Sequence, residues 1–390
     1  MVIGVPTESY PTERRVALTP EVAAALAGKG VEVVLEAGAG QAAGFPDAAY
    51  RERGVGLAVR PEVLGRADVL LQVRTPAAVP EAPATDLALL RAGQVLIGLA
   101  DPLTAGEGLR ALTGRGVTLF ALELLPRITR AQSMDVLSSM ATISGYRAVL
   151  LAAAALPRMF PLMMTAAGTV APARVLVIGA GVAGLQAIAT ARRLGGVVEA
   201  YDLRPEVREQ VQSLGARFVD LKLEAPAAAG TGGYAAAQTE EYYRRQREAL
   251  GRVVAASHVV ITTAAVPGRP APLLIIAEAV RAMAPGSVIV DLAAERGGNC
   301  ELTQPGRAVE VGGVQVIGPL NLPAEVPYHA SQMYAHNVAA FLRHLVRDGA
   351  VQYDLEDEIT RQTLVLRDGA VVHPEVAARL GEVGTAGEGR

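Results

Sequence analysis

One stretch of the chain, RVLVIGAGVAGLQAIATARRLGGVVEAYD (174–202), constrains the fold more than any other. An apolar run leads into Gly179, Gly181 and Gly184 in the spacing G-x-G-x-x-G, and a helix-like segment and a second apolar run follow, ending at Asp202. This order is typical of a βαβ unit that binds a dinucleotide. The first glycine permits a tight turn, the second lets a pyrophosphate approach the backbone, and the third lets helix and strand pack closely.

The same stretch predicts which dinucleotide is bound. The helix that begins after the glycine turn offers free N–H groups and the positive end of its dipole to phosphates. Asp202 is placed to accept hydrogen bonds from ribose hydroxyls and to repel a 2′-phosphate, which favours NAD(H); Arg204 weakens this preference a little. The alternative is a glycine turn that only packs an ordinary α/β unit. The expected contacts are Gly179, Ala180, Gly181, Val182, Gly184, Asp202, Leu203 and Arg204.

Two further segments fit a nucleotide site. TTAAVPG (262–268) follows another apolar run, and its small residues would let the backbone lie along the nicotinamide ribose; the contacts expected there are Thr263, Ala264, Ala265 and Val266. A plain βα loop is the alternative. The Ala/Gly-rich first half of 224–246, with Tyr234 at its tip, cannot fill a core, so it is either a lid over bound nucleotide or a passive insertion.

The whole chain alternates strand and helix signals. Its apolar runs are nearly continuous, which favours parallel sheets covered on both faces. The runs are VIGV, VEVVLEAG, ADVLLQVR, QVLIGLA and VTLFALELL in the first series, and RVLVIG, VVEAYD, ARFVD, HVVITTA, SVIVDLA and VQVIG in the second. We therefore predict an α/β fold with two Rossmann-like domains.

Long helices predicted at 135–157 and 329–348 precede and follow the second series. This predicts that the chain leaves an outer domain (1–135 plus 326–380), builds a nucleotide-binding domain (136–325) and returns, with a cleft between the domains. Smaller expectations are a first helix with Thr19 as N-cap, Pro20 at its start and Gly30 at its end, a hairpin turning at Asp368-Gly369, and a disordered tail at 381–390.

Composition excludes several classes of protein. The net charge of −3 gives no electrostatic reason to expect nucleic acid. The single cysteine, Cys300, excludes an internal disulfide and fits a reducing compartment. The amino terminus lacks the pattern of a signal peptide. The most apolar run, 148–156, is shorter than the ~20 residues of a membrane span, so we expect no direct membrane insertion.

The chain is poor in groups that transfer protons. None of its five histidines (His258, His329, His336, His344 and His373) lies in the first 257 residues, no Ser/His/Asp or Cys/His set is evident, Cys300 shows no sign of activation, and no metal-binding cluster appears. Dehydrogenases of hydroxy and amino acids need such a group beside the nicotinamide. Hydride transfer between two nicotinamide rings needs only their close apposition.

RITRAQSMD (127–135) places many polar groups between an apolar run and an Ala/Leu-rich helix. As a purely structural feature it would be a helix start, with Ser133 or Asp135 as the cap and the arginines solvated. A functional role is favoured by resemblance: RAQSMDVLSS, GYRAVL, VIGAGVAGLQA, YDLRPEVREQVQSLGA, TTAAVPGRPAP and SVIVDLAAERGGNCE resemble the NAD(H)-binding subunit, alpha-1 or domain I, of the proton-translocating nicotinamide nucleotide transhydrogenases.

The resemblance spans nearly the whole chain and implies specific roles. In that family, domain I binds NADH and passes hydride to NADP⁺ on a partner, coupled to proton movement through a membrane subunit. RITRAQSMD then faces the nicotinamide end of NAD(H): Gln132 bridges toward the second nucleotide, Arg127 and Asp135 pair and position the carboxamide and ribose, and Ser138 adds a hydroxyl contact. Ser133 and Met134 belong to the same site, and Gly233 and Tyr234 to a mobile loop that closes on nucleotide.

The implied assembly is a homodimer that joins a membrane alpha-2 subunit and an NADP(H)-binding beta subunit, peripheral on the cytoplasmic face of the membrane. MFPLMMTAAGTVAPARV (159–175) is a candidate exchanging arm, with a core hairpin as the alternative.

Alanine dehydrogenase is the second resemblance. Arg15 in ERRVALTP matches that family's substrate-carboxylate arginine, but Arg74 stands in place of its lysine, Glu295 in place of its aspartate, and VLIGLADPL has no histidine. A non-catalytic NAD-binding module is the third possibility.

Overall fold

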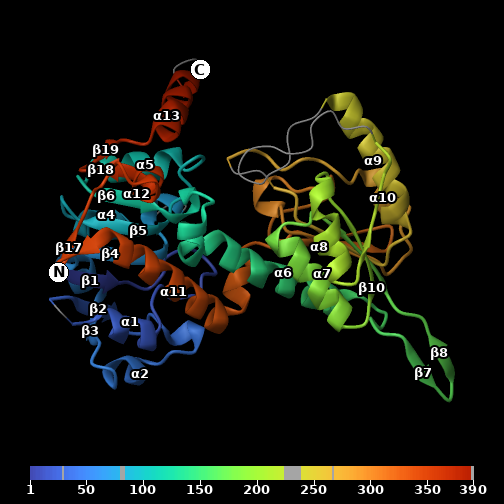
Figure 1. Ribbon diagram of the computed structural model, residues 1–390, viewed down its shortest axis with the longest axis horizontal. Helices are drawn as coiled ribbons and strands as arrows, with labels where there is room; N and C mark the ends of the chain where they lie inside the picture. The colour runs from blue at the N-terminus through green and yellow to red at the C-terminus, as the bar shows by residue number, and fades with distance from the viewer. Residues whose placement is uncertain (29, 80–83, 224–238, 266–267, 388–390) are drawn as a thin grey trace. The chain divides into compact units, whose positions relative to one another are not determined.

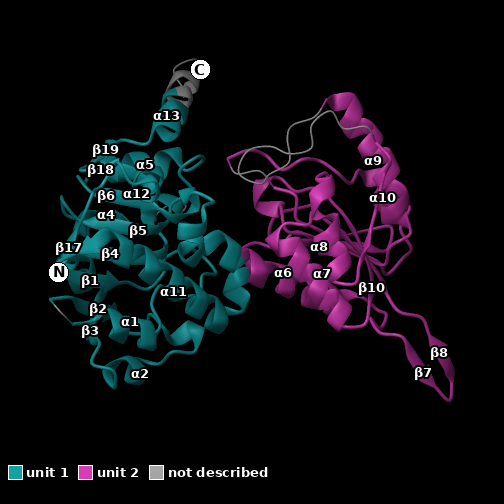
Figure 2. Cartoon of the chain, in the orientation of Figure 1, with its two compact units in different colours: residues 1–140, 323–390 teal, residues 141–322 magenta. Residues whose placement is uncertain are grey.

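The computed structural model describes residues 1–28, 30–79, 84–223, 239–265 and 268–387. Two compact units divide the chain (Figure 2): unit 1 comprises residues 1–140 and 323–390, and unit 2 comprises residues 141–322. The chain thus leaves unit 1 once and returns to it.

Unit 1 is built on an eight-stranded sheet in the order β19-β18-β6-β5-β4-β1-β2-β3 (Figure 1). Its six parallel strands are β1 Val2–Val5, β2 Glu32–Glu36, β3 Gly56–Ala58, β4 Val69–Arg74, β5 Val95–Leu99 and β6 Thr118–Ala121. The first five residues of β4 are all buried, as expected for a strand covered on both faces. The connecting helices are α1 Pro20–Leu26, α2 Asp47–Arg51, α3 Arg60–Arg66, α4 Ala84–Leu89 and α5 Gly106–Thr113.

The carboxyl-terminal segment completes this sheet. The strands β18 Leu364–Arg367 and β19 Ala370–Val371 form the predicted antiparallel hairpin. Asp368 and Gly369 both have positive φ, 49° and 81°, which is the geometry of a type I′ turn. Of the tail predicted to be disordered, residues 381–387 lie in the helix α13 Pro374–Gly387, and residues 388–390 lie outside the described residues. Pro374 at the first position and the helix-forming run Ala377–Leu380 start this helix, which then extends into the polar tail.

Unit 2 contains a seven-stranded sheet in the order β11-β10-β9-β12-β13-β15-β14. Its parallel strands are β9 Arg174–Ile178, β10 Val197–Tyr201, β11 Arg217–Phe218, β12 Val259–Thr262, β13 Val288–Asp291 and β15 Val314–Ile317, and its helices are α7 Val182–Arg193, α8 Arg208–Ser213, α9 Glu240–Ala255 and α10 Ala277–Arg281. In both units the parallel strands follow the order 3-2-1-4-5-6, which is that of a dinucleotide-binding fold. The predicted fold class, two Rossmann-like units with parallel sheets, is confirmed.

One strand of unit 2 was not predicted. β14 Ala308–Val311 pairs antiparallel with β15 through a turn at Gly312-Gly313, where φ is 61° and 79°. The sequence AVEVGGVQV carries the alternation and Gly-Gly signal of such a hairpin.

The two long helices differ in their relation to the units. α6 Val136–Ala155 crosses the boundary at residues 140 and 141, as expected of a linking helix, but α11 Pro327–Leu345 lies wholly in unit 1. α11 thus lies in unit 1, and it belongs to the stretch 326–380 that was predicted as part of the outer domain. Its apolar side chains account for this, since Tyr334, Phe341 and Leu342 are among those buried there. The expected cleft stays a prediction.

α6 is long and apolar enough to cross a membrane when only length and hydropathy are considered, contrary to the expectation that no run would be. Its apolar character has a packing explanation. Ala148, Val149 and Ala152 are completely buried in the core of unit 2, against residues of β9 and α7.

Unit 2 also carries a hairpin that projects from its body (Figure 1), formed by β7 Met163–Thr165 and β8 Gly168–Val170. All six strand residues are exposed, and Met164 is 78% exposed. The alternative of a core hairpin is therefore wrong.

Further elements of unit 1 bear on the site described below. They are β16 Val346–Arg347, β17 Ala350–Val351, α12 Glu358–Thr363 and the 3-10 helix η4 Thr129–Met134. In α1, Thr19 occupies the N-cap position without a side-chain capping bond, and the helix ends at Leu26, before Gly28, which has φ 106°.

Candidate functional site

The glycine turn lies after β9, next to β12, where the strand order of unit 2 reverses. Gly179 has φ 97°, and a Cβ there would lie 2.4 Å from Thr263 Oγ1. A Cβ on Gly184 would lie 1.8 Å from the carbonyl oxygen of Gly179, whereas a Cβ on Gly181 would have no atom within 4 Å. The first and third glycines thus serve packing, and the second leaves space in front of α7 where a phosphate can approach.

A fourth glycine, not predicted as functional, supports this turn. Gly145 lies in α6, and a Cβ there would lie 2.1 Å from the carbonyl oxygen of Ala183 in the first turn of α7. The helix backbones therefore approach each other closely at this point, which fixes the start of α7. The signal was a glycine inside a helical pattern, in GYRAVL, which usually has a packing reason.

Asp202 is fixed against the glycine turn. Its carboxylate accepts the N–H of Ala180 at 2.7 Å and the N–H of Arg204 at 2.9 Å. The guanidinium of Arg204 folds back on the same carboxylate, with Nε and Nη2 each at 3.0 Å. Each carboxylate oxygen therefore already accepts two hydrogen bonds, so a ribose hydroxyl that binds Asp202 would take the place of one of the bonds to Arg204. Arg204 thus orients Asp202 while it neutralises part of its charge.

The loop after β12 is held by buried side chains. Thr263 donates its N–H to Ile178 O at 2.8 Å and its hydroxyl to Gly179 O at 3.1 Å. The amide of Asn299 accepts the N–H of Ala264 at 3.0 Å and donates to the carbonyl of Ala264 at 2.8 Å. Asp291 in turn fixes Asn299 through its N–H at 2.7 Å. Both polar backbone groups of Ala264 are therefore engaged inside the protein, and Asn299 is a functional candidate that sequence reasoning missed.

Another side chain that the sequence did not single out lies near Asp202. Gln246 of α9 is buried and donates from Nε2 to the hydroxyl of Tyr201 at 2.7 Å. Its Oε1 is buried without a partner among the described residues. The open space at Gly181, the fixed Asp202 and this orphaned acceptor fit a dinucleotide, whose adenine and ribose offer donors and whose pyrophosphate needs close backbone approach.

The predicted residues of the glycine turn, of Asp202–Arg204 and of Thr263–Ala265 are thus brought together at one edge of the unit 2 sheet. Gly233, Tyr234 and Val266 lie outside the described residues.

The remaining predicted residues belong to unit 1. In η4, the side chains of Ala131 and Met134 are buried, whereas Gln132 and Ser133 are exposed and Arg127 lies exposed just before the helix. Ala131 and Met134 thus pack into unit 1, and Gln132 and Ser133 between them are exposed to solvent. Asp135 accepts the N–H of Ser138 at 2.9 Å and its hydroxyl at 2.6 Å. Asp135 therefore caps α6, as the structural alternative expected, and it brings Ser138 into the same group.

The arginine assigned by the alanine dehydrogenase resemblance is engaged internally. Arg15 is 3% exposed, and its Nε and Nη2 donate to the Glu13 carboxylate at 2.7 and 2.6 Å. The guanidinium of Arg74 stacks over the ring of Tyr10 at 4.1 Å. Glu295, in place of that family's aspartate, accepts the N–H of Asn321 at 2.8 Å. The Glu13 carboxylate thus already binds the Arg15 guanidinium, which is the group that a substrate carboxylate would use.

Glu123 holds the segment in which that resemblance expects a histidine. One oxygen, Oε1, accepts the N–H groups of Ala100 and Asp101 at 2.8 and 2.5 Å, and Oε2 is buried without a partner among the described residues. Burial raises the pKa of Glu123 to about 7 from its ordinary 4.5.

This predicts a measurable pH dependence. Between these two pKa values the folded protein binds more protons than the unfolded chain, so the contribution of Glu123 to the free energy of unfolding falls as pH rises, by up to about 1.4 kcal/mol per pH unit. Glu123→Gln keeps the acceptor for both N–H groups and removes the titration. Denaturant unfolding from about pH 5 to 7 is expected to show that the free energy of unfolding of the variant rises relative to that of the parent as pH increases, by up to about 1.4 kcal/mol per pH unit. Parallel curves, or an equal gain in the exposed control Glu107→Gln, would contradict this.

Other catalytic groups do not emerge from the part of the chain that the structure describes. There, no three His, Cys, Asp or Glu side chains are grouped to hold a metal ion. Cys300 is buried, and burial raises its pKa to about 11, so its thiol is not activated.

Comparison with known proteins agrees with this geometry. Residues 4–144 match the alanine dehydrogenase/PNT N-terminal domain, and residues 148–374 match the alanine dehydrogenase/PNT C-terminal domain. A relative from Rhodospirillum rubrum, named as the first part of NAD(P) transhydrogenase subunit alpha, is 47% identical over 383 residues, 97% of this chain and 100% of the relative.

Solved structures give the same grouping. A transhydrogenase from Sinorhizobium meliloti superposes with a TM-score of 0.85 at 45% identity, covering 95% of this chain and all of that one. An L-alanine dehydrogenase superposes with a TM-score of 0.81 at 27% identity, covering 98% of this chain and all of that one. The chain belongs to the alanine dehydrogenase/PNT family, and within it is most readily compared with the alpha subunits of NAD(P) transhydrogenases.

Proposed function

We propose that the chain is the NAD(H)-binding subunit of a proton-translocating nicotinamide nucleotide transhydrogenase. The observation that carries this proposal is the exposed Gln132, presented on η4 between buried Ala131 and Met134, in a chain whose segment 95–103 contains no histidine. A site with this composition favours transfer between two rings over oxidation of a hydroxy or amino acid, because the former needs proximity and no acid or base.

The residues of the chain have distinct roles in this proposal. NADH, when bound, supplies the hydride. The N–H groups at the start of α7 bind the pyrophosphate, and Asp202, oriented by Arg204, selects an unmodified adenosine ribose. Gln132, Arg127, Asp135 and Ser138 orient the nicotinamide end, with Ser133 and Met134 beside them. Gln132 extends toward the second nucleotide. Each of these groups positions the cofactor, and none moves a proton.

The partners follow from the names of the relatives. The relative from Rhodospirillum rubrum is named as one portion of a subunit alpha, which makes it one piece of a larger assembly. We therefore propose a membrane subunit and an NADP(H)-binding subunit as partners, with hydride transfer coupled to proton translocation and the chain lying on the cytoplasmic face of the membrane. We propose neither nucleic acid as a partner nor direct membrane insertion.

Mixing the purified chain with an NADP(H)-binding transhydrogenase subunit tests the function. We expect NADH-dependent reduction of an NADP⁺ analogue that requires both proteins. Ammonia-dependent reduction of pyruvate by the chain alone would instead favour the second candidate, an alanine dehydrogenase. Binding of NADH without either reaction would favour a non-catalytic module.

The exposed hairpin supports a homodimer as part of the proposal. Leu162, Met163 and Met164 lie together on a projecting segment and are 57%, 36% and 78% exposed, which is costly for apolar side chains unless a second copy covers them.

Replacing Met164 by Asp is expected to weaken dimerisation at least about tenfold, because burying a charge costs well over 1.4 kcal/mol. Light scattering across a concentration series measures this. The control is Val59→Asp, which places a charge at an apolar residue of unit 1 that is 65% exposed. A monomeric parent, or equal effects of the two substitutions, would contradict the prediction.

A further inference from the structure

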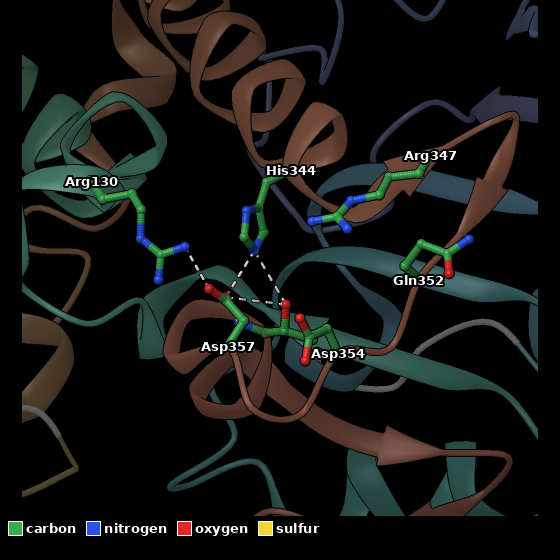
Figure 3. A pocket seen from close by; sticks show the side chains of 7 residues that line it. Arg130, His344, Arg347, Gln352, Asp354 and Asp357 are labelled. Atoms are coloured by element: carbon green, nitrogen blue, oxygen red, sulfur yellow. Dashed lines mark hydrogen bonds and ion pairs between the residues drawn. The ribbon is translucent and has the colours of Figure 1, made fainter.

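A group of polar side chains joins η4 to the carboxyl-terminal part of unit 1 (Figure 3). They line a small pocket formed by Arg130, His344, Arg347, Gln352, Asp354, Asp357 and Thr360. In Figure 3, Arg130 and His344 both point toward Asp357. Arg130 belongs to η4, two residues before Gln132, so this pocket adjoins the segment that carries the proposed catalytic residues.

Asp357 is the centre of the group. Its Oδ2 accepts Arg130 Nη1 at 2.5 Å, and its Oδ1 accepts the Thr360 N–H at 3.0 Å, which caps α12. His344 Nε2, from α11, lies 2.9 Å from Oδ1. Burial alone would raise the pKa of Asp357, but the Thr360 N–H and the Arg130 guanidinium lower it to about 2. The Asp357 carboxylate, which contacts α11 and α12, therefore holds Arg130 of η4 through an ion pair.

A second contact holds the other end of η4. Asn337 of α11 is 8% exposed and donates from Nδ2 to the carbonyl oxygen of Ser133 at 2.8 Å. A 3-10 helix of six residues has few and poorly aligned internal hydrogen bonds, so its geometry depends on such outside contacts. The two contacts flank Gln132.

We propose that Asp357 and Asn337 are positioning residues that hold η4 in the geometry in which Gln132 and Asp135 are presented. The inference deepens the proposed function and rests on it. The pair Arg130–Asp357 links residues 227 positions apart, so the carboxyl-terminal segment sets the geometry of a loop in the first third of the chain.

Asp357→Asn tests this, because asparagine keeps an oxygen to cap α12 and loses the charge that holds Arg130. Arg130→Met removes the other partner at a side chain that is 53% exposed, where loss of folding is not expected. The matched control is Arg347→Met, which lines the same pocket and makes no ion pair with the described residues. Two readouts apply: hydrogen exchange of residues 129–134 in the chain alone, and kcat against KM for transfer with the partner subunit.

We expect faster exchange and a roughly tenfold to hundredfold loss of kcat in both variants, with the KM for NADH changed much less, since small misplacements of orienting groups act mainly on the reacting geometry. The double variant should be no worse than either single variant, because both remove one interaction. Unchanged exchange and kcat, or equal losses in the control, would overturn the proposal. If the parent transfers no hydride, the proposed function fails, and hydrogen exchange alone still decides whether the contacts hold η4.

Discussion

Replacing Gly181 by alanine is expected to raise the dissociation constant for NADH on the order of a hundredfold while leaving the protein folded. A Cβ at this position has no protein atom within 4 Å, and φ and ψ of −75° and −168° are allowed for alanine. Loss of glycine at the N-cap of α7 should cost no more than about 1 kcal/mol of stability. The space that the methyl group fills is the space that the pyrophosphate needs.

Gly184→Ala is the matched comparison. Its Cβ would lie 1.8 Å from Gly179 O, a backbone atom that cannot move without displacing the turn. We expect it to lose several kcal/mol of stability, more than the ~1–3 of ordinary overpacking, and to lose NADH binding as a consequence. Nucleotide fluorescence and denaturant unfolding of both variants separate the two effects. Unchanged NADH affinity in Gly181→Ala would contradict the placement of the pyrophosphate.

Gln132→Asn is expected to lower kcat for transfer to the partner's NADP⁺ about a hundredfold, with a much smaller change in NADH affinity. The shortened side chain keeps its amide but withdraws it by one methylene, and displacements of about 1 Å have effects of this size. Because Gln132 is exposed on η4, the fold should not respond.

Thr129→Ala, at an exposed residue of the same 3-10 helix, is the control for this variant. Steady-state kinetics with both proteins, together with NADH titration of the chain alone, give the two quantities. Equal losses of kcat in both variants would show that any change in η4 suffices, and would remove the special role of Gln132.

The strand–glycine–helix pattern predicted much of unit 2 because each of its residue types is required by the structure of its immediate neighbours in the chain. Gly179, Gly184 and Asp202 occupy positions that the turn, the helix packing and the end of β10 require, so spacing alone identified them. The continuous apolar runs likewise predicted the parallel strands other than the short β3, since strands covered on both faces have few polar residues.

Sequence reasoning failed where a residue acts through distant partners. Asn299 donates a hydrogen bond to Ala264, Gly145 packs against Ala183, and Asp357 accepts a hydrogen bond from Arg130, which lies 227 positions away. A local sequence pattern cannot detect pairs with such spacings. Length and composition likewise predicted the long helix at 329–348, but its packing in unit 1 depends on side chains from distant segments, which a local pattern cannot show.

The central claim is that hydride passes directly from NADH on this chain to NADP⁺ on a partner, without an acid or base of its own. Incubating the chain and an NADP(H)-binding partner subunit with NADH deuterated at the transferred position tests it by mass spectrometry of the products. The proposal predicts that the NADPH formed carries the deuterium in full, in ordinary water. Label lost to solvent, or deuterium found in a small organic product made by the chain alone, would contradict it.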